Sequence, residues 1–349
     1  MTVVPLPARD AGGAAAGSAS DTRPGAGVAE EDGAGPSRAV AIRGLTKTYA
    51  GTKQEPPKTA LKGIDLDVPR GAFFGLLGPN GAGKSTLINI LAGLVDKTAG
   101  TVRVWNHDID RERRAAKMAI GIVPQELNID PFFTPRQLLD LQSGLYGLRR
   151  SEYRTAEILE AVGLTDKANA YARTLSGGMR RRLLIGKALL HSPPIVVLDE
   201  PTAGVDVELR KNLWTYMRAL NAAGTTILLT THYLEEAERL CDTIAIIDEG
   251  ELIACAPTVD LVARLDTKDI VVTVEDDLGA VPAALGQFDV ILAAPRRLVF
   301  RCRRSVNRVR EIVEAIHAAR LVIADLSTTE GRLEDVFLAL TRDRQKAVT

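Results

Sequence analysis

A glycine-rich segment in the first third of the chain constrains its fold more than any other feature. The segment GPNGAGKST, from Gly78 to Thr86, directly follows the apolar stretch FFGLL and precedes a run with helical periodicity. It fits the pattern G-x-x-x-x-G-K-[S/T] in the strand-to-helix context that gives this pattern its meaning. Its glycines let backbone N–H groups face phosphate oxygens, and the start of the following helix favours anions. The segment therefore predicts a nucleotide-binding α/β domain.

Two side chains of this segment add to what the backbone offers. Lys84 can place a positive charge on the β- and γ-phosphates, and the Ser85 hydroxyl can ligate Mg²⁺. We therefore predict ATP and Mg²⁺ as the cofactors. The positions of this segment that we expect to contact them are Gly78, Pro79, Asn80, Gly81, Ala82, Gly83, Lys84, Ser85 and Thr86.

A second segment, PPIVVLDEPTAGVD, reads as an apolar strand that ends in two acidic residues. Asp199, at the end of the strand, is placed to hold the Mg²⁺ shell. Glu200 is then placed to act on an attacking water as a general base. The alternative interpretation is a strand followed by a solvated acidic turn, which the glycine-rich segment upstream makes less favourable.

A third segment, LSGGM, from Leu175 to Met179, precedes a predicted helix. The Ser176 hydroxyl and the amides of Gly177 and Gly178 at a helix N-terminus form a second predicted anion site. The helix continues with three arginines at 180–182, which we expect to form a solvated face. A nucleic-acid patch is the less favoured alternative, because the chain has 44 Lys plus Arg and 44 Asp plus Glu.

Short apolar runs and helical periodicity alternate along the chain, which indicates a parallel α/β sheet. The predicted strands are 39–45, 64–69, 73–77, 120–123, 195–199, 226–230 and 243–247, with a hairpin turn at 248–250. The predicted helices are 84–94, 135–146, 151–161, 177–190 and 207–221.

The composition divides the chain into three parts. Residues 1–38 are rich in Ala, Gly, Pro and Ser and predict a disordered tail. A translation start assigned too far upstream is the alternative. Residues 39–265 hold every motif described above. Residues 266–349 predict a second, small α/β domain, with a helix after Ser305 and no motif that carries chemistry.

Cysteine usage and hydropathy indicate the cellular compartment in which the protein is expected. The three cysteines have no metal-ligand spacing, which fits a reducing compartment. The sequence has no apolar run of about 20 residues and no signal peptide at its start. We therefore expect a cytoplasmic protein whose membrane role, if it has one, comes through a partner.

The motifs together resemble a known family. Gly78–Ser85, Gln125 after IGIVP, LSGGM, LDEPT, AGVD and TTH stand in the order of an ATP-binding cassette (ABC) ATPase. The longer stretches LSGGMRRRL and LLTTHYLEEAERLCD are most similar to the ATP-binding subunits of ABC-2 type exporters, which include bacterial drug, lipid and polysaccharide exporters. Met179 stands where many ABC proteins have Gln, and ABC-2 exporters often carry Met there.

The resemblance implies a P-loop ABC domain with a RecA-like core, an antiparallel β subdomain and a helical subdomain. It also implies that Tyr49 stacks on adenine, although a strand-end aromatic is the plainer interpretation. Gln125 would touch Mg²⁺ or water and report the nucleotide state to a membrane partner; an ordinary loop amide is the alternative. Asp206 would lie in the loop joining two sites, and His232 would contact the γ-phosphate.

The resemblance further implies a homodimer, because Ser176 and Gly178 would bind the γ-phosphate across a subunit interface. ATP would close the dimer and hydrolysis would reopen it, energising a separately encoded permease at the inner face of the cell membrane. The alternative is a soluble ABC ATPase acting on nucleic acid or ribosomes, which the single cassette without a coiled-coil insertion disfavours. The C-terminal domain would stabilise the dimer or dock a partner. Glu235, Glu236 and Glu238 predict a solvated acidic face.

Overall fold

The computed structural model describes residues 38–51, 56–205, 207–263, 267–303, 309–330, 333–334 and 336–337. The chain divides into two compact units, one ending at Cys255 and the other beginning at Ala256. The domain boundary suggested by composition, between residues 265 and 266, lies a little beyond this division.

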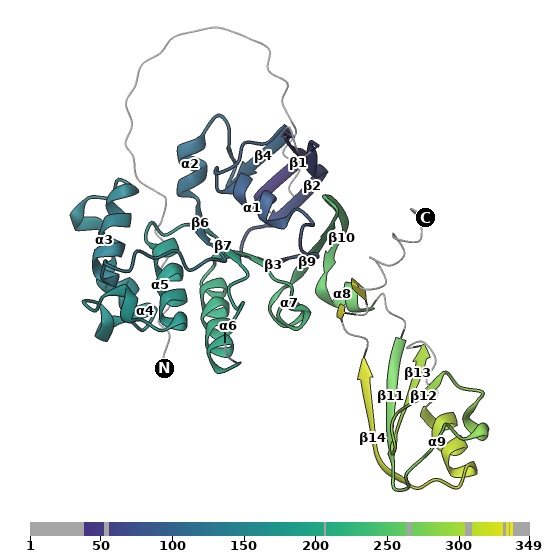
Figure 1. Ribbon diagram of the computed structural model, residues 1–349. Helices are drawn as coiled ribbons and strands as arrows, with labels where there is room; N and C mark the ends of the chain where they lie inside the picture. Colours follow the sequence, from purple (N-terminus) through teal and green to yellow (C-terminus); the bar gives the residue numbers. More distant parts are fainter. Residues whose placement is uncertain are drawn as a thin grey trace. The chain divides into compact units, whose positions relative to one another are not determined.

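The first unit contains a parallel sheet, an antiparallel sheet and seven described helices (Figure 1). Its strands are β1 (Arg38–Tyr49), β2 (Lys58–Pro69), β3 (Phe73–Leu77), β4 (Ala99–Val104), β5 (His107–Asp108), β6 (Ile120–Val123), β7 (Ile195–Asp199), β8 (Thr226–Thr230), β9 (Thr243–Asp248) and β10 (Glu251–Pro257). Its α-helices are α1 (Lys84–Leu91), α2 (Arg113–Met118), α3 (Pro135–Leu145), α4 (Thr155–Ala161), α5 (Gly177–Leu189), α6 (Val207–Ala222) and α7 (Leu234–Leu240).

The larger sheet has the order β10-β9-β3-β8-β7-β6. The neighbouring pairs β9/β3, β3/β8, β8/β7 and β7/β6 are parallel, as the alternation of strands and helices predicted. The hairpin between β9 and β10 turns at Glu249 and Gly250, both with positive φ. Because parallel strands point the same way, the loops after β3, β7 and β8 leave the sheet at one edge.

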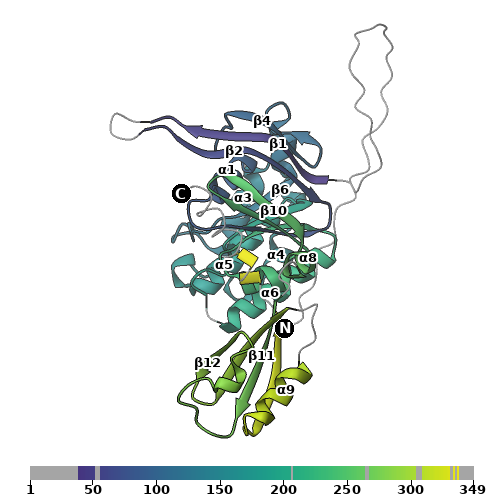
Figure 2. The same ribbon diagram turned by 90° about the vertical axis from the view of Figure 1, so that its right-hand side faces the viewer.

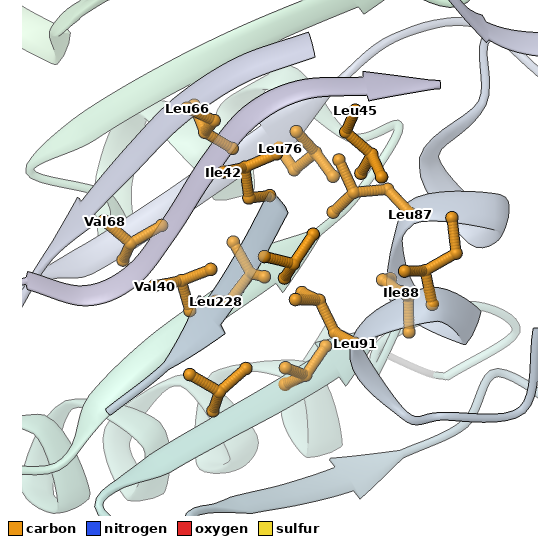
Figure 3. Close-up of a cluster of buried hydrophobic side chains, with 14 of the residues drawn as sticks. Val40, Ile42, Leu45, Leu66, Val68, Leu76, Leu87, Ile88, Leu91 and Leu228 are labelled. Carbon is orange, nitrogen blue, oxygen red and sulfur yellow. The ribbon is translucent and has the colours of Figure 1, made fainter. Parts of the chain in front are cut away.

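The core lies between the two sheets and is organised around α1 (Figure 3). Leu87, Ile88 and Leu91 of α1 pack between the antiparallel sheet, represented by Ile42, and the parallel sheet, represented by Leu76. Each such apolar side chain contributes roughly 1.5–3 kcal/mol when fully buried. This packing fixes the start of α1, and with it the glycine-rich loop. On the other face of the parallel sheet lie α6 and α7 (Figure 1).

The antiparallel sheet has the order β2-β1-β4-β5, and β1 pairs with both β2 and β4. The helices α3, α4 and α5 pack on one another as a separate helical part (Figure 1). Thr134 caps α3 in a reciprocal capping box with Gln137, and Ser176 caps α5 by accepting a bond from the Met179 amide. The helix predicted at 151–161 begins only at Thr155, because residues 150–152 form a separate 3₁₀ turn.

The second unit is small and α/β, as composition predicted. Its elements are α8 (Thr258–Ala263), β11 (Thr267–Val274), β12 (Val290–Ala294), β13 (Arg297–Arg303), α9 (Val309–Ala318) and β14 (Ile323–Glu330). The strands form an antiparallel sheet in the order β12-β13-β11-β14. The helix α9 lies against this sheet (Figure 2). Its Ile312 and Ile316 belong to one buried cluster with Ile270 and Phe300 of the sheet. Ser305, the predicted helix cap, lies outside the described residues.

None of the helices in the described ranges combines the length and the apolar character that crossing a bilayer requires.

One half-buried histidine joins the helical part to the parallel sheet. His191, just after α5, has Nε2 3.1 Å from the Ile120 carbonyl, and its ring stacks on Tyr146 with 3.9 Å between ring centroids. Burial lowers the pKa of His191 to about 4, with the bond to Ile120 opposing that change. The folded protein therefore keeps this imidazole neutral.

His191 should make the stability of the protein depend on pH. Below pH 6.5 the unfolded chain takes up a proton at this residue, whereas the folded chain resists doing so until about pH 4. The stabilisation from a neutral His191 is thus full above pH 6.5 and declines as the pH falls towards 4. Between pH 7 and pH 5 we expect wild type to lose about 1–2 kcal/mol more unfolding free energy than His191→Phe. Urea titrations of both proteins at both pH values measure this difference. Equal losses of unfolding free energy in the two proteins would contradict a neutral His191 in the folded state.

Candidate functional site

The glycine-rich loop leaves β3 and ends where α1 begins. Gly81 and Gly83 have φ values of 83° and 111°, which favour glycine, and a Cβ on Gly83 would lie 2.7 Å from the Ala60 carbonyl oxygen. Lys84 is buried, and its ammonium donates to the Gly78 and Pro79 carbonyls at 2.6 and 3.0 Å. Burial lowers the pKa of Lys84, while the charges of Glu200 and Asp199 oppose that change. The loop thus presents a cation held by its own carbonyls.

The two acids lie where β7 ends, beside the end of β8. Thr230 of β8 donates its hydroxyl to Asp199, and the Glu200 amide donates to the Thr230 carbonyl at 3.0 Å. Burial raises the pKa of Asp199, an effect that the Thr230 bond partly offsets. Glu200 has φ 45°, in the left-handed region. This conformation turns the chain at the strand end, where the Glu200 side chain meets residues from two other loops.

Three predicted residues meet at the Glu200 carboxylate. The amide nitrogen of Gln125 donates to Glu200 Oε2 at 2.8 Å. The same oxygen lies 3.2 Å from Nδ1 of His232, which follows β8. The Gln125 loop follows β6, so three separate strand ends contribute to this cluster. A carboxylate held by two polar side chains at a strand edge suits a group that orients and deprotonates water.

The cluster opens into a cavity of about 510 Å³ that also contains the glycine-rich loop. Its lining residues are Tyr49, Lys58, Ala60, Asn80, Gly81, Gly83, Lys84, Ser85, Thr86, Gln125, Glu200, Ala203 and His232. Tyr49 is 37% exposed, and its hydroxyl lies 3.4 Å from that of Thr86. The cavity is lined both by the partly exposed ring of Tyr49 and by the Glu200 cluster. Lys58 is a lining cation that the motifs did not indicate.

The remaining predicted residues lie elsewhere. Ala82 is buried, and its carbonyl accepts from the Gly250 amide. Ser176 and Gly177 are exposed at the start of α5 and do not line this cavity, and neither does the adjacent Gly178. Asp206 lies outside the described residues. One copy of the chain therefore does not bring LSGGM to the Glu200 cavity.

The prediction of a solvated arginine face is wrong for Arg181, which is 3% exposed. Its guanidinium donates to the Pro124 and Gln125 carbonyls at 2.7 and 2.8 Å. Burial lowers the pKa of Arg181, and the charge of Asp199 opposes that change. Position 181 shares a helical face with the buried Leu184, Ile185 and Ala188, the signal that could have placed it inside.

The prediction of a solvated acidic face is wrong for Glu236, which is fully buried in α7. Its Oε1 accepts from the Thr202 hydroxyl at 3.0 Å and from the Trp214 indole N–H at 2.8 Å. Thr202 comes two residues after Glu200, so this carboxylate supports the segment that carries the site. Position 236 borders the buried Ala237 and Leu240 on the helix, which is the signal that favoured the interior.

Comparison with known proteins points to the same family as the motifs. Residues 61–203 match the model of the family described as ABC transporter. The chain is 38% identical to a daunorubicin resistance ATP-binding protein of Streptomyces coeruleorubidus, over 88% of this chain and 97% of that protein. The chain belongs to the ABC transporter family. Its ATP-binding subunits also include a Nod factor export ATP-binding protein of Ralstonia nicotianae, 38% identical over 88% of this chain and 95% of that one.

Solved ABC structures share the fold of this subunit. A dimeric bacterial ABC transporter cassette superimposes with a TM-score of 0.57 and 28% identity, over 63% of this chain and 98% of the other. A dimeric post-hydrolysis state of such a cassette, bound to ADP and Pi, gives a TM-score of 0.56 at 28% identity. The predicted fold, a P-loop ABC domain with an additional α/β domain, and the predicted ATPase activity are confirmed.

Proposed function

We propose that this ATPase is the motor of an ABC-2 type exporter and that two copies of the chain share two ATP sites. The observation that carries the proposal is the Glu200 carboxylate, held by Gln125 and His232 in one cavity with the glycine-rich loop. The named relatives are resistance and export proteins, which favours an exporter over the rival, an ABC ATPase acting on nucleic acid or ribosomes.

The glycine-rich loop binds the phosphates in this proposal. Its amides and the start of α1 face the anion, and the Lys84 ammonium leaves the Gly78 and Pro79 carbonyls for the β- and γ-phosphates. Tyr49, whose partly exposed ring lines the cavity, stacks on the adenine. Asn80, Gly81, Ala82, Gly83 and Thr86 shape the loop around the phosphates.

Magnesium fits the oxygen donors present. The Ser85 hydroxyl, the Asp199 carboxylate and the Gln125 amide oxygen are hard ligands of the kind that Mg²⁺ prefers, and Ser85 and Gln125 line the cavity. When bound, Mg²⁺ supplies neutralisation of phosphate charge. Asp199 is preorganised for this role because the Thr230 hydroxyl orients its carboxylate.

Glu200 acts as the general base. Its carboxylate orients the attacking water and takes up a proton from it as the water oxygen bonds to the γ-phosphorus. The bond from that phosphorus to the bridging oxygen breaks at the same time, which releases ADP and phosphate. Gln125 and His232 hold the same carboxylate oxygen, so the direction of the other oxygen is restricted. His232 also contacts the γ-phosphate, which connects loss of that phosphate to the geometry of the base.

A second copy completes each site. Ser176, Gly177 and Gly178 cap an anion site at the start of α5, and this site does not face the cavity of its own chain. These three residues bind the γ-phosphate of ATP held by the partner, and Asp206 joins the two sites. The proposed ATPase domain spans residues 39–265, and the domain at 266–349 stabilises the dimer. The predicted tail at 1–38 lies outside the described residues except for Arg38, which begins β1. ATP closes this homodimer and hydrolysis opens it.

Replacing Glu200 by Gln should abolish turnover while ATP binding persists. The amide keeps the shape of the side chain but cannot accept a proton, so phosphate release should fall by about 100-fold or more. Phosphate release and equilibrium ATP binding are measured on the same preparation. Glu235→Gln, an acid on the neighbouring helix outside the cavity, serves as control. Phosphate release near the wild-type rate would eliminate Glu200 as the base.

The permease contacts a second cavity, of about 390 Å³, between the helical part and the parallel sheet. Its lining residues are Ala92, Leu94, Lys117, Ile120, Ile122, Pro124, Asn128, Gln142, Tyr146, Leu184, Lys187 and Ala188. Leu94 is 75% exposed beside it. Burial lowers the pKa of the half-buried Lys187. This groove suits a cytoplasmic segment of the permease that carries apolar residues and a carboxylate, and it would hold the chain at the inner face of the cell membrane.

Reversing the charge in this groove should release the motor from its permease. Lys187→Glu places a carboxylate where a partner carboxylate is expected, and like charges at such a contact repel. We expect copurification with membranes that contain the permease to fall at least about fivefold. Lys211→Glu, the same change at an exposed position of α6, should leave copurification intact. Unchanged copurification of Lys187→Glu would argue against docking in this groove.

A further inference from the structure

Arg181 has an environment that helix packing alone does not require. Its guanidinium is 3% exposed, its Nε has no hydrogen-bond partner, and no carboxylate within 4 Å pairs with it among the described residues. Burying a charge without a paired countercharge is costly. The compensation comes from two backbone carbonyls, those of Pro124 and Gln125, and from the more distant charge of Asp199. The hydrogen-bond acceptors of Arg181 therefore both belong to the Gln125 loop.

These contacts form a continuous path through one chain. Ser176 caps α5, and Arg181 lies five residues further along the same helix, roughly 7.5 Å at 1.5 Å per residue. The guanidinium donates hydrogen bonds to the backbone of the Gln125 loop, and the Gln125 side chain donates to Glu200. A rigid helix, two hydrogen bonds and one amide thus connect the anion site at Ser176 to the carboxylate at Glu200.

We infer that Arg181 couples the two ATP sites of the dimer, transmitting occupancy of the site at Ser176 to the Gln125–Glu200 pair of the same chain. The inference rests on the proposed dimer, in which Ser176 of each chain contacts ATP held by its partner. When that ATP binds, α5 shifts with its cap, and Arg181 carries the Gln125 loop with it. Each site is then fully assembled only when the other is filled.

The neighbouring arginines do not provide this connection. Arg180 donates to the carbonyl of Leu175, just before its own helix, and Arg182 donates to the carbonyls of Val162 and Gly163 within the helical part. Of the three, Arg181 alone bonds to the Gln125 loop. The planar fork of arginine holds two carbonyls in fixed relative directions, whereas the three donors of an ammonium rotate freely. Arg181 is therefore a positioning residue, and Arg180 provides a matched control.

The test compares Arg181→Met in two dimers assembled from the purified full chain. In the homodimer both sites fill, so loss of Arg181 should lower kcat about 5- to 10-fold with little change in the ATP concentration at half-maximal rate. In a heterodimer whose partner carries Lys84→Ala, the intact P-loop faces the partner's Ser176, while the intact chain's own Ser176 faces an empty site. Arg181 of the intact chain then has no occupancy to transmit, so Arg181→Met there should lower kcat less than about twofold.

The outcomes separate coupling from local support. An equal loss of kcat in both dimers would mean that Arg181 only props the Gln125 loop, and it would overturn the inference. Arg180→Met should leave kcat unchanged in both, and Arg181→Lys, whose ammonium lacks the fixed planar fork, should lower kcat of the homodimer less than Arg181→Met does. Failure of shared sites shows separately. Dimers of Ser176→Arg with Lys84→Ala chains contain one intact site if sites are shared and should then recover part of the ATPase activity, whereas they would stay inactive if sites are not shared.

A second measurement requires no heterodimer. Backbone amide hydrogen exchange of residues 122–127 is followed with and without ATP in Glu200→Gln, which retains ATP. ATP should slow this exchange by at least about threefold with Arg181 present and leave it unchanged in the added Arg181→Met variant. Equal protection by ATP in both would overturn the coupling, whereas absence of ATP protection with Arg181 present would contradict ATP-driven movement of the loop.

Discussion

The parallel pairing of β3, β8 and β7 is the constraint on which the site depends. Leu76 pairs with Thr230, and Thr230 pairs with Asp199, so three strands end at one level. The glycine-rich loop, Glu200 and His232 follow these strand ends, so strand pairing alone brings them to one cavity. Core packing around α1 holds this level, because Leu87 and Leu91 are locked between the two sheets. The chemistry is thus set by strand register before any ligand enters.

Each acidic or basic side chain at this edge of the sheet has a compensating contact. Lys84 is satisfied by loop carbonyls, Asp199 by the Thr230 hydroxyl, and Glu200 by Gln125 and His232. Behind them, Glu236 fixes Thr202 through a buried hydrogen bond. A nucleotide whose phosphates replace the carbonyl contacts of Lys84 would change the electrostatic environment of Glu200. Nucleotide binding would in this way affect the proposed general base. In the proposed mechanism, this one cluster both binds phosphate and responds to its loss.

The sequence predicted the parts of the site that follow from short motifs. Loops that follow parallel strands all leave the sheet at the same edge, so motifs in those loops come close together. Gln125, Glu200 and His232 meet as expected, although their catalytic roles stay predictions. Arg181 and Glu236 were assigned to solvated faces, since charged residues in helices usually are, and only tertiary packing buried them. The short β4, β12 and α2 were missed because a few residues carry too little periodicity. The proposed contact of Ser176 with ATP involves a second chain, which the sequence of one chain does not place.

The account depends most on the claim that each ATP is enclosed by two copies of the chain. The structure of the nucleotide-bound form of the protein, with ATP and Mg²⁺ and hydrolysis blocked, tests it through a single contact. We expect the ATP held by Lys84 of one copy to have its γ-phosphate within hydrogen-bond distance of the Ser176 hydroxyl of the other copy. An ATP enclosed by one chain alone, with both copies' Ser176 remote from it, would contradict the account.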